Sequence, residues 1–164
     1  MQRLSVLLCS LSIFIAISSC QETNPDQNTM ALNGTWVDVA STETATVNTY
    51  LSYHFKANNQ LEILRVIIND NNNEVLGFKY RGLGTYSLYE ETLTLSVNEV
   101  YLNNDTVHGY TALENLVLTD GTFEEVVTIS FSENNKILTF EYPPCQATHN
   151  CQGELTLYKS ELPF

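Results

Sequence analysis

The chain has 164 residues, of which 43% are hydrophobic and 16% charged, so a foldable core is expected and a disordered acidic tail or a coiled coil is excluded. Nineteen acidic residues against seven basic ones give a formal net charge of −12. This balance argues against a nucleic-acid or anionic-lipid binder, because both functions need clustered positive charge.

The first twenty residues have the pattern of a targeting segment. Arg3 is the single charge of a short leading region, and an apolar run interrupted by serines extends from Leu4 to Ile17. This run is too short and too rich in serine for a comfortable membrane span. It ends with an aliphatic residue, two serines and Cys20.

The four residues 17–20 resemble the lipobox of bacterial lipoproteins. In that family the chain is cut directly before the cysteine, whose thiol is diacylated. The resemblance implies a signal peptide over 1–19 and palmitate-type acyl chains on Cys20 that anchor the protein to a membrane, at about 0.8 kcal/mol per buried CH2. Gln21 stands where an aspartate would signal retention in the inner membrane, so the outer membrane is favoured. The domain could then face either the periplasm or the cell exterior. A plain secretory signal, with Cys20 incidental, is the alternative.

The rest of the chain divides into a polar stretch and a patterned one. Residues 20–31 are polar after the cysteine, contain Pro25 and lack periodicity, which predicts a flexible tether. From Thr35 onward apolar residues recur with period two in short segments separated by Asn, Asp and Gly turns. Residues 32–164 are therefore predicted to form one all-β domain, an antiparallel up-and-down meander of about eight to ten strands closed into a barrel. A flat sandwich is the alternative architecture.

Two places interrupt the regular alternation. Beyond Asn98 the apolar side of the expected strand changes parity, which indicates a β-bulge. Residues 107–118 fit a short helical turn as well as an irregular strand.

The predicted domain opens with a short motif. Gly34 and Trp36 stand in the order Gly-x-Trp on the first expected strand, which resembles the lipocalin signature. The stretch 32–159 is similar to the small lipocalin-like domains of bacterial envelope lipoproteins. This resemblance implies a lipocalin-like (calycin) barrel, in which the tryptophan caps one end and the other end admits a small hydrophobic ligand. Lipocalins stack an arginine on this tryptophan, and Lys159 is the late cation nearest to that place.

Six aromatic residues share the parity expected to face the barrel interior, and they are the candidate ligand wall. They are Tyr53, Phe55, Phe78, Tyr80, Tyr86 and Phe140. An eight-stranded barrel is just wide enough either to be filled by side chains or to hold one small ligand. The favoured hypothesis is a barrel that binds or carries a small apolar molecule. The alternative is a filled barrel that acts through its outer surface, as a non-enzymatic accessory protein of an envelope assembly.

Two late cysteines, Cys145 and Cys151, flank five residues that include His149. Outside the cytoplasm such neighbours most often form a disulfide, which would stabilise the fold by roughly 2 kcal/mol on the chain-entropy model. A zinc site with His149 is the alternative, but zinc ligands usually come in tighter pairs. No metal and no other cofactor is therefore expected.

The remaining polar residues give no pattern for catalysis. His54, His108 and His149 lack a Ser, Cys or Asp partner at an informative spacing, so the protein is not expected to be an enzyme. The glutamate pairs at 90–91 and 124–125 are interpreted as solvated charges at turns and strand ends.

Two loops carry weak motifs. Asp70 to Glu74 alternate oxygen ligands as a calcium loop does, but they lack its glycine and its distal glutamate, so a hairpin turn is predicted. Residues 105–107, Asp-Thr-Val, resemble an acceptor for O-glycans of some envelope proteins, with an ordinary turn as the alternative.

Overall fold

The computed structural model describes residues 27–38, 46–144 and 153–161. Within these ranges the chain forms one short α-helix, α1 (Gln27–Leu32), one 3-10 turn, η1 (Leu113–Asn115), and nine strands. The strands are β1 (Gly34–Asp38), β2 (Val47–Phe55), β3 (Gln60–Asn69), β4 (Glu74–Tyr89), β5 (Thr92–Leu102), β6 (Val117–Thr119), β7 (Phe123–Ser132), β8 (Ile137–Glu141) and β9 (Glu154–Ser160).

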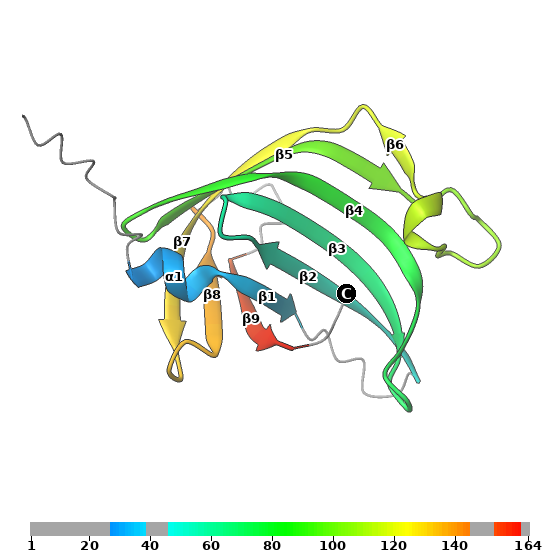
Figure 1. Ribbon diagram of the computed structural model, residues 1–164, viewed down its shortest axis with the longest axis horizontal. Coiled ribbons are helices and arrows are strands. Elements are labelled where there is room, and N and C mark those ends of the chain that lie inside the picture. Colours follow the sequence, from blue (N-terminus) through cyan, green and yellow to red (C-terminus); the bar gives the residue numbers. More distant parts are fainter. Residues whose placement is uncertain (1–26, 39–45, 145–152, 162–164) are drawn as a thin grey trace, which may run out of the picture.

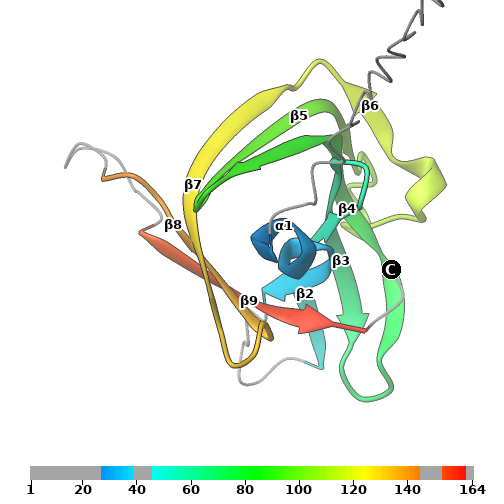
Figure 2. The same cartoon turned by 60° about the vertical axis from the view of Figure 1, so that its left-hand side comes forward.

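Eight of the strands form a closed antiparallel ring. Strands β1 to β5 pair in chain order, each with its neighbour. Strand β5 then pairs with β7, β7 with β8, and β8 with β9. The ring closes where β9 pairs with β1. Figure 2 shows the ring, with α1 seen end-on inside it. The predicted all-β meander and its closure into a barrel are confirmed, and the flat sandwich is excluded.

The barrel wall is taller on one side than on the other. Strands β2 to β5 have 9 to 16 residues, whereas β1, β8 and β9 have 5 to 7. The tall strands run past the short ones toward one end, as Figure 1 shows. Strands β1, β3, β5 and β8 terminate at that end of the barrel, which we call the mouth. The end covered by α1 is called the closed end.

The predicted bulge beyond Asn98 is confirmed, since Leu83 pairs with Glu99 and Gly84 with Val97, which leaves Asn98 as the extra residue. The ambiguous stretch 107–118 contains both expected elements, because η1 lies at its centre and β6 begins near its end. Strand β6 stands outside the ring and pairs with the mouth end of β5 (Figure 1).

A second bulge corrects the prediction for Phe78. Arg65 pairs with Tyr80 and Val66 pairs with Phe78, so Lys79 is an extra residue that inverts the parity of β4. Phe78 therefore leaves the interior. It packs on the outer face with a small cluster that contains Leu64, Val66, Ile68, Tyr50 and Leu113.

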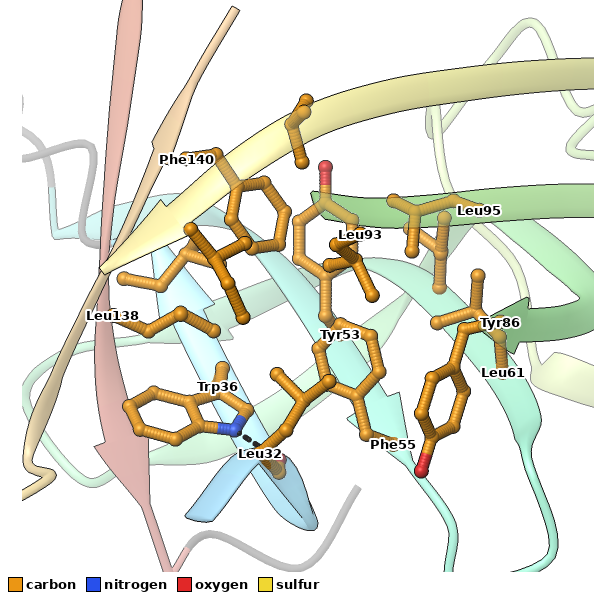
Figure 3. Packing of buried hydrophobic residues seen from close by; sticks show 14 of the residues in the cluster. Leu32, Trp36, Tyr53, Phe55, Leu61, Tyr86, Leu93, Leu95, Leu138 and Phe140 are labelled. Atoms are coloured by element: carbon orange, nitrogen blue, oxygen red, sulfur yellow. Dashed lines mark hydrogen bonds between the residues drawn. The ribbon is translucent and has the colours of Figure 1, made fainter. Parts of the chain in front are cut away.

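The barrel interior is a packed core rather than an empty chamber. Phe55 and Tyr86 meet edge to face with ring centroids 5.1 Å apart, and Tyr53 meets Phe140 at 5.4 Å. Buried leucines from β3, β5, β8 and β9 fill the space between these rings, and Figure 3 shows most of this packing. The barrel interior toward the closed end is thus filled by the protein's own side chains.

The closed end begins earlier in the chain than expected. The tether was predicted to reach residue 31, but Gln27–Leu32 form α1, and Leu32 is completely buried. Trp36 is also buried and donates from Nε1 to the Leu32 carbonyl at 2.7 Å (Figure 3). This helix could not be predicted from the sequence, because its six residues are too few to show helical periodicity.

Lys159 joins α1 to the last strand. Its Nζ lies 5.0 Å from the centroid of the Trp36 ring and donates to the Ala31 carbonyl at 3.2 Å. Gly34 makes this approach possible, because its φ of +123° disfavours side chains and Cε of Lys159 lies 3.4 Å from where a Cβ would stand. Gly34, Trp36 and Lys159 therefore lie together at the closed end beside α1.

Candidate functional site: the mouth of the barrel

Inward-facing residues near the mouth line a pocket of about 260 Å3. Their positions follow from strand parity, since residues two apart on one strand point to the same side. On β3 this parity places Arg65 above Ile63, and on β7 it places Glu125 above Val127, which is in the core. The full lining is Leu51, Tyr53, Ile63, Arg65, Tyr80, Phe123, Glu125 and Tyr142.

Glu125 is the central polar group of one wall. It is half-buried, and burial raises the pKa of its carboxyl above the ordinary value, although a hydrogen bond from Tyr142 opposes this rise. The hydroxyl of Tyr53 in turn interacts with that of Tyr142, so the three polar groups lie close together in the pocket. Burial, with Glu125 beside it, raises the pKa of Tyr142 to about 12, and burial raises the pKa of Tyr53 further still.

Arg65 and Tyr80 form the opposite wall on neighbouring strands. They are paired across β3 and β4, and the guanidinium charge lowers the pKa of Tyr80 while the larger effect of burial raises it. The Tyr80 ring lies flat along β4, because Gly82 leaves room for it: a Cβ on Gly82 would stand 2.6 Å from the Tyr80 hydroxyl. The tyrosine ring therefore forms part of this wall.

The six candidate aromatics have three different positions. Tyr53 and Tyr80 line the mouth pocket. Phe55, Tyr86 and Phe140 are buried in the core, and the Tyr86 hydroxyl lies 2.9 Å from the Lys56 carbonyl at the closed end. The sixth, Phe78, is on the outer face.

Sequence reasoning missed the role of Glu125. The pair at 124–125 was interpreted as two solvated charges, and that interpretation holds for Glu124, which is exposed and near Ser96 on the outer surface. Glu125 instead has the same parity as Val127 and Ile129, which both belong to the core. This shared parity was the signal that could have found it.

Several other candidates lie away from the mouth or outside the described residues. Cys20, Cys145, Cys151 and His149 belong to the latter group, so the lipid anchor and the disulfide stay predictions. Within the described part of the chain, no three His, Cys, Asp or Glu side chains gather as a metal site. No helix there has the length and apolar character needed to cross a membrane.

The two described histidines make local contacts on the outer surface. The His54 ring is 3.1 Å from Thr35 Oγ1 and 2.9 Å from Ser52 Oγ, and burial lowers its pKa. His108 Nδ1 is 3.0 Å from Asp105, which also accepts from the Val107 amide in an exposed turn.

The loop between β3 and β4 is a hairpin turn, as predicted. Asn69 Oδ1 accepts from the Asn71 amide, and Asn73 takes a positive φ of 55°. Asp70 is occupied in accepting hydrogen bonds from Asn48 and Tyr50.

A hollow of about 390 Å3 on the outer wall is a weaker candidate, although it is lined by two cations, Lys56 and Arg81. Both are already paired with Glu62, at 3.1 Å and 2.8 Å. Burial raises the pKa of Glu62, but these two partners outweigh it and hold the pKa below its usual value. The charges of this hollow therefore satisfy one another, unlike those of the mouth.

No protein-family model, curated protein or solved structure matches this chain. Function is consequently argued from the geometry of the mouth and from the sequence.

Proposed function

We propose that this protein is a lipid-anchored envelope protein whose barrel binds a small molecule in its mouth. The observation that carries the proposal is the pocket of about 260 Å3 above a filled core, where apolar walls meet a few convergent polar groups. Ligand sites generally combine these two features. Pockets for drug-sized molecules have about 300–1,000 Å3, so a smaller ligand is favoured here.

The resemblance to lipocalins supports the proposal at the other end of the barrel. Trp36 is buried at that end with the Lys159 Nζ 5.0 Å from its ring centroid, whereas lipocalins stack an arginine on their tryptophan. The space available to a ligand is smaller than the sequence-based hypothesis assumed, because three of the six candidate aromatics are buried in the core. The cargo would therefore occupy the mouth rather than the depth of the barrel.

The anchor is proposed from the sequence alone. The lipobox-like residues 17–20 support acylation of Cys20 and attachment to the outer membrane. Incorporation of labelled palmitate into the wild-type chain, and its loss in Cys20→Ala, is the expected result. Continued labelling of that variant would refute the anchor without bearing on the pocket.

The binding function is tested by titrating the full chain with 1-aminoanthracene, an uncharged apolar fluorophore. Enhanced fluorescence is expected, together with its loss in Leu51→Trp, which fills the pocket from β2. The control is Leu118→Trp on the exposed face of β6, which should bind as wild type does. Equal binding by both variants would overturn the proposal, and so would a wild-type chain that binds neither this fluorophore nor the smaller compounds titrated below.

A second candidate function is favoured by a different observation. Strand β6 ends the sheet order, and Val117 and Leu118 are exposed there. An unpaired strand edge with apolar side chains suits contact with another protein. If no small molecule binds, an accessory role through this edge becomes the favoured function, and Leu118→Lys should then abolish co-purification of an envelope partner.

A further inference from the structure

The mouth pocket holds two opposite charges that do not neutralise each other. Arg65 comes from β3 and Glu125 from β7, and both line the pocket without forming an ion pair. Tyr80 is paired with Arg65 across β3 and β4 and lines the same pocket. Arg65 is exposed to solvent, and among the described residues no protein group hydrogen-bonds its guanidinium, whereas the half-buried Glu125 interacts with Tyr142.

This arrangement is costly in the free protein. A carboxylate that loses part of its water and gains no cation destabilises the fold, and an apolar residue at the same place would avoid the cost. The outer hollow shows the usual solution, where Glu62 is paired with two cations. The pocket thus retains a charge pattern that a bound molecule could complete.

We propose that the mouth pocket binds a small zwitterion, of the size of an amino acid, with its ammonium group on Glu125 and its carboxylate on Arg65. This inference rests on the proposed function and specifies its ligand class. A carboxylate suits the planar guanidinium, which can bind both oxygens at once.

The remaining lining residues suit the uncharged part of such a ligand. The rings of Tyr53, Tyr80 and Phe123 offer faces for cation–π contact with the ammonium group or for packing against a side chain. Leu51 and Ile63 add an apolar base. A ligand with one charge is disfavoured, because it would engage either Arg65 or Glu125 but not both.

The test is a series of three compounds with the same phenyl group, titrated into the isotope-labelled full chain and followed by NMR. Phenylalanine has both charges, phenethylamine has the positive one, and 3-phenylpropionate has the negative one. Phenylalanine should bind at least tenfold more tightly than either of the others. Binding of phenethylamine or of 3-phenylpropionate that is as tight as the binding of phenylalanine would overturn the proposal.

Variants then assign each charge to its residue. Glu125→Gln and Arg65→Gln should each weaken phenylalanine binding by tenfold or more, and Glu125→Gln should leave 3-phenylpropionate binding unweakened. Two matched controls change exposed charges outside the pocket. Glu124→Gln removes the charge next to Glu125, and Lys79→Gln removes the charge next to Tyr80. Both variants should bind phenylalanine as wild type does. Binding unchanged in Glu125→Gln or in Arg65→Gln would overturn the assignment, and the compound series stands even if a variant fails to fold.

The result also separates this inference from the proposed function. Binding of 1-aminoanthracene without preference for phenylalanine would refute the zwitterion and keep the pocket. The absence of binding by every compound would refute both.

Discussion

The closed end and the mouth are built by the same eight strands, yet they bury different kinds of side chain. At the closed end Trp36 and Leu32 are fully buried, and the Trp36 Nε1–H group donates to a carbonyl at 2.7 Å. At the mouth the half-buried Glu125 and the exposed Arg65 line one pocket without forming an ion pair. One end thus satisfies its buried polar group internally, and the other keeps a half-buried carboxylate without a cation beside it.

The difference teaches how a small barrel divides stability from binding. The closed end has tight ring packing and a helix held by a cation, which are features that stabilise. The mouth has a half-buried carboxylate, which costs stability and which the proposed ligand would engage. Substitutions at the two ends should therefore have effects of different size and opposite sign.

The largest effect is expected from Trp36→Ala at the closed end. Removal of a fully buried indole from a packed core should lower the free energy of unfolding by about 3–5 kcal/mol. Urea unfolding followed by circular dichroism measures it. Tyr89→Ala is the control, because Tyr89 is 76% exposed and should change stability by about 0.5 kcal/mol or less. Similar losses in both variants would contradict the assignment of the core.

A smaller effect is expected from Lys159→Met, which keeps the length of the side chain but removes its charge. Loss of the contact with the Trp36 ring and of the hydrogen bond to Ala31 should cost about 1–2 kcal/mol. Lys159→Arg should recover most of that stability, because a guanidinium makes both contacts. Hydrogen exchange of the α1 amides should accelerate in the Met variant first. Equal exchange in the two variants would show that the cation does not hold the helix.

The smallest effect, with the opposite sign, is expected from Glu125→Gln at the mouth. Burial raises the pKa of Glu125, so folding favours its protonated form, and the ionised form opposes folding once the pH exceeds that pKa. Glutamine keeps an acceptor for Tyr142 and removes the charge. The variant should melt at a higher temperature at pH 7, by less than about 4 °C, the shift that 1 kcal/mol gives in a domain of this size.

The pH dependence provides the check on this prediction. The advantage of Glu125→Gln should disappear as the pH falls below about 4.3, where the carboxyl is protonated in the folded and unfolded states alike. Calorimetric scans of both proteins between pH 3 and 8 would measure it. An advantage that persists at pH 3 would mean that packing, and not the charge, separates the two proteins.

Regular stretches of the fold followed from the sequence, and irregular ones did not. Period-two alternation predicted the meander, and the parity change after Asn98 predicted its bulge. The bulge at Lys79 gave no such signal, because Phe78 and Tyr80 are both aromatic and keep the same spacing whether or not a residue is extra. Phe78 was consequently assigned to the interior, although it lies outside.

The sequence by itself determined the all-β class and the turn positions, because these depend on local patterns of apolar and turn-forming residues. The tertiary structure decided which aromatics form core and which form a pocket, since that depends on where the tall strands extend past the short ones. It also decided that Arg65 and Glu125, sixty residues apart in the chain, share one pocket without neutralising each other. Ring closure brings these residues together, and no local pattern encodes the distance between two charges on different strands.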